Sequence, residues 1–140
     1  SFLHECLASG KNPESEPRIA RLLDALRDTI AASGRRVCVV AGADLAHVGP
    51  RFGDPQPVTP AFLSDVERAD RAMLDAVAAC DAREFYESVA RDGDSRRICG
   101  LSPIYALLKG AGASSGALLH YAQWQDPQAA VTFASLDFPP

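Results

Sequence analysis

The sequence predicts an α/β protein, a mixed sheet with flanking helices, and three patterns lead to this fold class. An amphipathic stretch over residues 16–33 leads into a continuous apolar run at residues 37–41, as in a helix followed by a strand buried on both faces. Helical patterns then dominate residues 60–110. Two strand-like stretches near the end, residues 117–125 and 130–136, predict an antiparallel hairpin.

The first long helix is expected over residues 16–33, because Pro17 suits its first position and Gly34 its termination. Its apolar residues fall at helical spacing on one face: Ile19, Leu22, Leu23, Leu26 and Ile30. The following run, residues 37–41 (VCVVA), predicts a strand of the kind that is buried on both faces. Residues 42–60 contain many glycines and prolines, so we expect an irregular surface loop at the strand end.

Three further helices are predicted from their first residues. Thr59 is placed as an N-cap in front of Pro60, and the helix that follows directs Phe62, Val66, Met73 and Val77 inward. Asp81, with a glutamate three residues later, resembles a capping box for a helix that ends near residue 91. Ser102 and Pro103 then fit the start of a short helix, IYALLKG.

Composition restricts the class of protein. The 140 residues fit a single domain, residues 1–140, that can bury its own core. No apolar run approaches the roughly 18 residues that a membrane span needs, so we expect no membrane association. A net charge of −4 with scattered basic residues argues against a nucleic-acid partner. The four cysteines lie far apart in the sequence, which favours reduced thiols in a cytoplasm over a disulfide framework or a zinc knuckle.

The densest cluster of candidate site residues is AGADLAHVGPRFGD, residues 41–54, directly after the predicted strand. Ligands collect at the carboxyl ends of strands in open α/β sheets, and histidine suits proton transfer or metal binding near neutral pH. Asp44 lies three residues before His47 and could orient its ring. Arg51 could bind an anionic substrate, or it could be solvated or paired with Asp54. The alternative for His47 is a half-buried structural histidine.

Cys99 precedes the helix predicted near Pro103, where the helix dipole favours a thiolate that could act as a nucleophile or metal ligand. The alternative is a cysteine that packs as a small hydrophobic residue. His4 and Cys6 would share a face if residues 4–6 formed a strand, and could then bind a metal together. His120 is expected on a sheet face. The motifs of serine hydrolases, nucleotide-binding loops and zincins are absent from the sequence.

Four segments resemble a known family, the Memo-like proteins, which in bacteria are also called AmmeMemoRadiSam system protein B. They occur in the order of the family and lie within residues 37–138: GADLAHVGPRFGD, DRAMLDAVAACDAREFYESV, RRICGLSPIYALL and LLHYAQWQDPQAAVTFASLDF. The family is similar in fold to LigB-type class III extradiol dioxygenases, with a mixed α/β sheet and a metal-type site in a cleft at the strand ends. The resemblance therefore supports the same fold class.

The resemblance also implies roles for individual residues. His47 looks like the acid/base histidine of the dioxygenases, and Cys99 looks like a metal ligand at a position where those enzymes have a glutamate. Two histidine ligands of the family have no match in this sequence, so we expect the chain to be the C-terminal portion of a Memo-like protein whose N-terminal half is absent. Iron or copper is the implied metal, held incompletely by this chain. A thiolate ligand favours Cu(I) or a redox role over ring cleavage.

Two functions are consistent with the sequence. The first is a part of a metal-associated redox protein, with His47 and Asp44 in proton transfer and Cys99 as ligand. The second is a non-catalytic module that binds a small molecule or an anionic peptide in the same cleft, partly through Arg51. Association with the absent half, or a homo-oligomer, is expected if the missing half leaves a sheet edge exposed.

Overall fold

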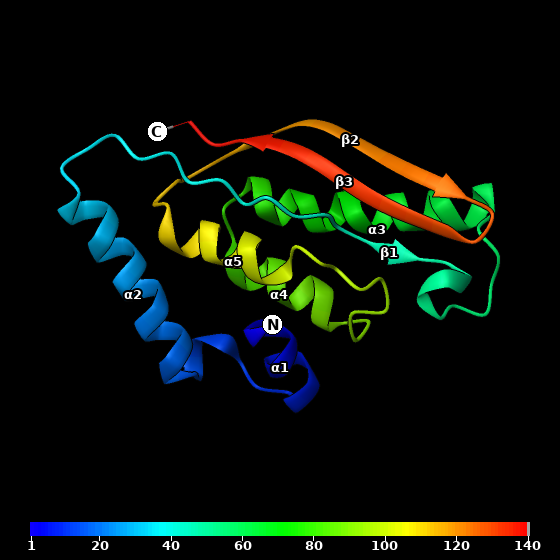
Figure 1. The fold of residues 1–140 in the computed structure, drawn as a ribbon, viewed down its shortest axis with the longest axis horizontal. Helices are drawn as coiled ribbons and strands as arrows, with labels where there is room; N and C mark the ends of the chain where they lie inside the picture. The colour runs from blue at the N-terminus through cyan, green and yellow to red at the C-terminus, as the bar shows by residue number, and fades with distance from the viewer. Residues whose placement is uncertain (140) are drawn as a thin grey trace.

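The computed structural model describes residues 1–139 and contains five α-helices and three strands (Figure 1). The elements follow in the order α1 (Phe2–Ser9), the 3₁₀ turn η1 (Pro13–Ser15), α2 (Pro17–Ala32), β1 (His47–Val48), the 3₁₀ turn η2 (Pro50–Phe52), α3 (Pro60–Ala78), α4 (Ala82–Ala90), α5 (Leu101–Gly110), β2 (Ala117–Asp126) and β3 (Ala129–Asp137). The predicted mixture of helices and sheet is confirmed.

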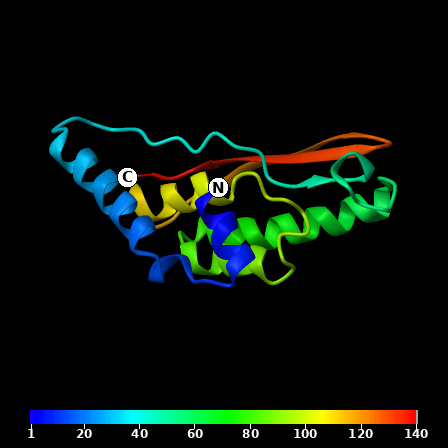
Figure 2. The same cartoon turned by 60° about the horizontal axis from the view of Figure 1, so that its bottom comes forward.

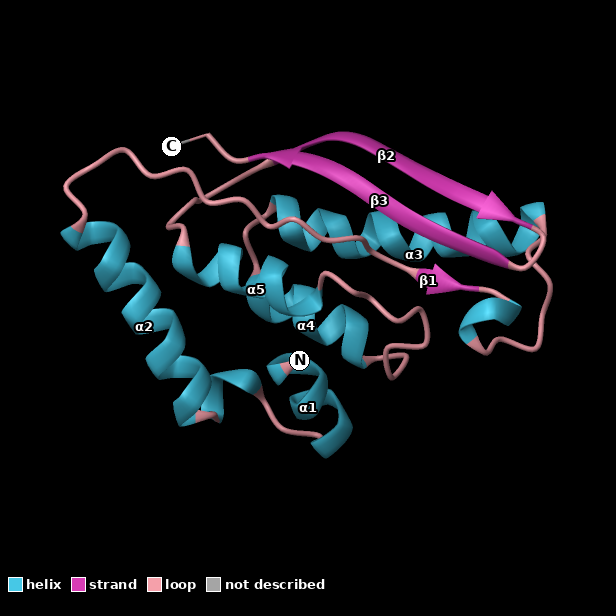
Figure 3. Cartoon of the chain, in the orientation of Figure 1, coloured by secondary structure: helices cyan, strands magenta, loops and turns pink. Residues whose placement is uncertain are grey.

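The sheet has the strand order β1-β3-β2, and both of its pairings are antiparallel (Figure 3). We expected a mixed sheet, but the residues that the structure describes form no parallel pair. β2 and β3 form the predicted hairpin, with Asp126 paired with Ala129 next to the turn. β1 adds only two residues, His47 opposite Val131 and Val48 opposite Ala130. The candidate histidine is therefore part of the sheet rather than of a loop beyond it.

Three helices begin at the residues expected from their capping signals. Pro17 is the first residue of α2, and the side chain of Thr59 accepts a hydrogen bond from the Phe62 N–H at the start of α3. Asp81 likewise accepts from the Glu84 N–H at the start of α4. These signals act within one turn of helix, which is why the sequence alone locates them.

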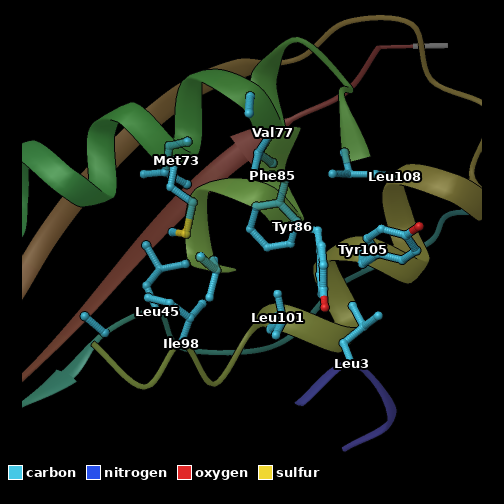
Figure 4. Packing of buried hydrophobic residues seen from close by; sticks show 14 of the residues in the cluster. Leu3, Leu45, Met73, Val77, Phe85, Tyr86, Ile98, Leu101, Tyr105 and Leu108 are labelled. Carbon is cyan, nitrogen blue, oxygen red and sulfur yellow. The ribbon is translucent and has the colours of Figure 1, made fainter. Parts of the chain in front are cut away.

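The helices cover one face of the sheet, and the core lies between the sheet and the helices (Figure 2). Figure 4 shows side chains from α3, α4 and α5 meeting the loop residues Leu45 and Ile98. Leu3 of α1 closes the cluster at one end. On the uncovered face of the hairpin, Leu119, Trp124 and Phe133 are exposed. No helix among residues 1–139 has both the length and the apolarity that a membrane crossing requires.

The strand predicted at residues 37–41 is wrong. This run is irregular and largely exposed, with Val37 46% and Val40 80% accessible (Figure 1). A buried strand needs a hydrogen-bonding neighbour, and the described structure gives the backbone of residues 36–43 none. The buried segment is instead Leu45 to Val48, inside the region expected to be a surface loop.

This correction has a measurable consequence for stability. Val40→Ala should change the free energy of unfolding of this chain by no more than about 0.5 kcal/mol, because the side chain is already in solvent. Val48→Ala, the same substitution in β1 at 2% exposure, should cost about 1.5 to 3 kcal/mol. Urea denaturation compares the two variants. Equal losses would mean that residues 37–41 are buried after all.

Candidate functional site

The candidate site is built on residues 45–48, which lie between β3 and the loop that precedes α5. On one side, the Leu45 N–H donates to the Thr132 carbonyl at 2.8 Å, and the Thr132 N–H donates to the Ala46 carbonyl at 3.0 Å. On the other side, the His47 N–H donates to the Arg96 carbonyl at 2.7 Å. The segment that carries His47 is therefore fixed from both sides by backbone hydrogen bonds.

The His47 ring faces oxygen atoms at both of its nitrogens. Nδ1 lies 3.3 Å from the Leu45 carbonyl oxygen, and Nε2 lies 3.8 Å from a carboxylate oxygen of Asp44. The ring also meets the edge of Phe52, with ring centres 5.2 Å apart. At 3.8 Å the carboxylate is too far for a direct hydrogen bond. The structure thus places Asp44 beside His47, as their spacing suggested.

Cys99 lies on the loop before α5 and contacts the His47 segment at Leu45. It is exposed, it precedes the first residue of α5 by two positions, and its N–H donates to the Leu45 carbonyl at 3.0 Å. The carbonyl oxygen of Leu45 is therefore within hydrogen-bond distance of both the His47 ring and the Cys99 backbone. Two residues that are 52 positions apart in the sequence are held at one carbonyl group.

Gly100 permits this close approach. A Cβ atom built at Gly100 would lie 2.9 Å from the carbonyl oxygen of Asp44 and 2.6 Å from a side-chain carbon of Ile104. A larger residue would therefore push the Cys99 segment away from the His47 segment. The glycine of the RRICG segment has a steric role at the site.

Arg51 points to the end of the hairpin. Its guanidinium lies 3.1 Å from a carboxylate oxygen of Asp126, and its backbone N–H donates to the Gln128 carbonyl at 2.9 Å. Asp54, the alternative partner from the sequence, instead pairs with Arg97 at 2.6 Å and accepts from the Gly49 N–H at 2.7 Å. The substrate-binding role of Arg51 stays a prediction.

Arg97 is a residue that the sequence did not single out. Its guanidinium binds Asp54 and also donates to the His47 carbonyl at 3.1 Å. It therefore links the loop that follows β1 back to the candidate histidine. Its neighbour Arg96 turns the opposite way, into the core, where it is 8% exposed.

Arg96 meets a buried carboxylate, Asp70 of α3, which is fully inaccessible to solvent. Asp70 also accepts hydrogen bonds from the hydroxyl groups of Thr132 at 2.6 Å and Tyr121 at 2.9 Å. Burial raises the pKa of the Asp70 carboxyl above its ordinary value, although the Thr132 hydrogen bond and the charge of Arg96 act in the opposite direction. One signal could have revealed Asp70: it is a charged residue on the apolar stripe of α3 that contains Val66 and Met73.

The other candidate ligands do not join this site. Residues 4–6 belong to α1, not to a strand, so His4 and Cys6 do not share a face. His4 lies 3.3 Å from Asp94, and Cys6 is buried. His120 is exposed on β2, as expected. A cavity of about 490 Å³ lies between α1, η1 and α4, where it is lined by Lys11 and Tyr86.

The described residues do not form a metal site on their own. Among residues 1–139, no group of three or more histidine, cysteine, aspartate or glutamate side chains is arranged to hold a metal ion. His47, Asp44 and Cys99 therefore do not constitute the ligand set of an iron or copper centre. What the arrangement offers is a histidine with a neighbouring carboxylate, and an exposed cysteine whose backbone N–H donates to the same Leu45 carbonyl that the ring faces.

The accessibility of the four free cysteines predicts their order of reaction. Cys38 and Cys99 are exposed, whereas Cys6 is buried and its pKa is raised by burial. We expect iodoacetamide to modify Cys38 and Cys99 first and Cys6 last, because alkylation needs an accessible thiolate. Mass spectrometry of peptides over time measures the order. Early modification of Cys6 in folded protein would contradict the burial of α1 against α5.

Asp54 should make stability depend on pH. Although its burial opposes ionisation, the hydrogen bonds from Arg97 and from the Gly49 N–H, with the charge of Arg97, lower the pKa of Asp54 below its ordinary value. The stabilisation is thus present above the unfolded-state pKa near 3.9 and is lost as pH falls through the lower folded-state pKa. Asp54→Asn should cost about 1 kcal/mol at pH 7, since Arg97 is partly exposed, and less near pH 3. Urea denaturation at both pH values measures this difference, and a pH-independent cost would contradict the assignment.

The fold and the site define a mixed α/β protein in which a histidine and a cysteine from distant segments meet at one carbonyl group. Residues 8–136 match the Memo-like protein family, and this match covers most of the chain. The chain therefore belongs to the Memo-like protein family, as the four sequence segments predicted. No protein in a search of curated sequences matches the chain.

Proposed function

We propose that this chain is the C-terminal portion of a Memo-like, metal-associated redox protein and supplies part of a site for iron or copper. In this proposal Cys99 is a thiolate ligand, His47 transfers protons, and Asp44 orients the His47 ring. The remaining ligands come from outside the chain, because the described residues do not complete a ligand set.

The observation that carries the proposal is the junction at the Leu45 carbonyl. That oxygen lies 3.3 Å from the His47 ring and 3.0 Å from the Cys99 backbone nitrogen. A soft thiolate suits Cu(I), and an imidazole changes its charge near neutral pH. The two groups have complementary chemistry, and both are accessible, since Cys99 is exposed and the His47 side chain is 21% accessible.

Metal analysis of the whole protein that contains this chain tests the ligand role. Wild type grown with iron or copper should retain the metal, whereas Cys99→Ser should lose most of it. Cys38→Ser is the matched control, because Cys38 is also an exposed free cysteine but lies on the irregular segment before β1. Equal retention by wild type and Cys99→Ser would overturn the ligand role.

Activity measurements separate the proposal from its rival. Oxygen consumption or copper reduction should be present in the metal-loaded protein and lost in His47→Gln. The rival is a non-catalytic module that binds a small molecule or an anionic peptide through Arg51. The Arg51 side chain is 57% exposed, and its guanidinium is paired with Asp126. If neither activity is found and an anionic peptide binds wild type but not Arg51→Ala, the redox proposal fails.

A further inference from the structure

We propose that Asp70 is a positioning residue that holds the His47 segment and the Cys99 segment in register. The inference takes from the proposed function only the roles of those two residues. It concerns a carboxylate that lies in the core and is not exposed at the site itself.

Asp70 gathers donors from three different parts of the chain. One carboxylate oxygen binds the guanidinium of Arg96, in the loop before α5. The other accepts from Thr132 of β3 at 2.6 Å and from Tyr121 of β2 at 2.9 Å. A single buried side chain on α3 is thus bound to both long strands and to the loop that leads to Cys99.

Two of these donors also bind the segment that carries His47. The backbone carbonyl of Arg96 accepts from the His47 N–H at 2.7 Å. The hydroxyl of Thr132 accepts from the Ala46 N–H at 2.9 Å, while it donates to Asp70. Asp70 therefore does not contact the His47 segment directly. It binds Arg96 and Thr132, and these two residues bind the backbone of that segment from either side.

The same contacts extend to Cys99. Arg96 lies three residues before Cys99, and between them the Ile98 side chain is fully buried. The Cys99 N–H then returns to the His47 segment through the Leu45 carbonyl. Displacement of Arg96 would move this loop relative to β1, and with it the thiol relative to the imidazole.

Packing alone would not require a charge at this position. A buried ion pair is often no more stabilising than apolar residues of similar volume, because both charges must leave water. What the carboxylate adds is direction, since its oxygens accept from donors at fixed positions. Asp70 therefore lies in the core beneath the half-buried His47 and the exposed Cys99, and its hydrogen bonds fix the segments that carry them.

Two direct readouts test the inference in the chain itself, without metal. They are the ring signals of His47 in a proton–nitrogen NMR spectrum and the rate at which iodoacetamide alkylates Cys99. Asp70→Asn removes the charge at nearly constant shape. Thr132→Val removes the hydroxyl that joins Asp70 to Ala46, whereas Thr132→Ser keeps a hydroxyl at this position.

Tyr121→Phe is the matched control. It also removes one hydrogen bond to Asp70, but the other hydrogen bond of the Tyr121 hydroxyl comes from the Gln123 side chain at 3.0 Å and not from residues 45–48. We expect Asp70→Asn and Thr132→Val to shift the His47 ring signals and to speed Cys99 alkylation about twofold or more, as coupling within one hydrogen-bond network predicts. Thr132→Ser and Tyr121→Phe should resemble wild type in both readouts.

Unchanged His47 signals and an unchanged Cys99 rate in folded Asp70→Asn and Thr132→Val would overturn the inference. So would equal changes in Tyr121→Phe, because these would indicate general loosening of the core. If Asp70→Asn does not fold, Thr132→Val and Thr132→Ser decide alone. If Cys99→Ser retains as much metal as wild type, the ligand role of Cys99 fails, but the His47 signals and the Cys99 alkylation rate still test the role of Asp70. The two proposals can therefore be refuted independently.

Discussion

Asp70→Ala is expected to lower the free energy of unfolding by about 3 to 5 kcal/mol, the largest loss from any single polar side chain discussed above. The substitution removes the buried partner of Arg96, a residue that is 8% exposed, and leaves its guanidinium only the longer contact with Asp92 at 3.5 Å. Two hydroxyl groups, those of Thr132 and Tyr121, lose their acceptor at the same time. Urea denaturation followed by circular dichroism measures the loss.

Asp75→Ala is the control, because it makes the same change on the same helix at an exposed position. It should alter stability by no more than about 0.5 kcal/mol. A second test removes both charges. Asp70→Asn combined with Arg96→Met should cost less than Asp70→Ala alone, since no unpaired charge is left in the core. A double variant as unstable as Asp70→Ala would show that the loss comes from packing rather than from the buried charge.

The parts of the fold that the sequence predicts well are those decided within a few residues. Thr59 and Asp81 cap helices through their own side chains, and Pro17 begins a helix because its ring fixes the backbone angle. The hairpin is also local, because β2 and β3 are joined by a short turn after Asp126. These elements agree with their sequence signals for that reason.

The strand expected at residues 37–41 depended on something that local pattern does not contain. An apolar run becomes a buried strand only where other segments pair with its edges and cover its faces. In the described structure β3 pairs with residues 45–48 instead, through Thr132 and Val131. The apolar pattern indicated where a strand could form, but pairing with β3 determined which residues form the strand.

The candidate site shows the same division. The proximity of Asp44 to His47 follows from their spacing of three residues. The approach of Cys99 does not, because it depends on the hydrogen bond between two distant segments at Leu45. Asp70 was recognisable in principle as a charge among the inward residues of α3, yet its partners Arg96 and Thr132 are set only by the fold.

Gly49→Ala is expected to destabilise the protein by more than about 2 kcal/mol, through backbone strain and a clash. Gly49 follows β1 directly and has a φ of +105°, which residues with a side chain rarely adopt. A Cβ atom there would lie 2.8 Å from a Val58 side-chain carbon and 2.9 Å from the Gln128 carbonyl oxygen. The second contact is with backbone at the hairpin turn, so it cannot be relieved by a rotamer change.

Gly53→Ala separates strain from clash. Gly53 has a similar φ of +94°, but a Cβ atom there would meet nothing within 4 Å. The Gly53→Ala variant should lose only about 1 to 2 kcal/mol of unfolding free energy, because only the backbone conformation is strained. The His47 ring signals of this variant should match those of wild type. Gly49→Ala should shift those signals as well, because relief of the clash must move β1 away from the hairpin. Equal costs for the two variants, with His47 undisturbed in both, would mean that the turn after β1 does not hold the histidine in place.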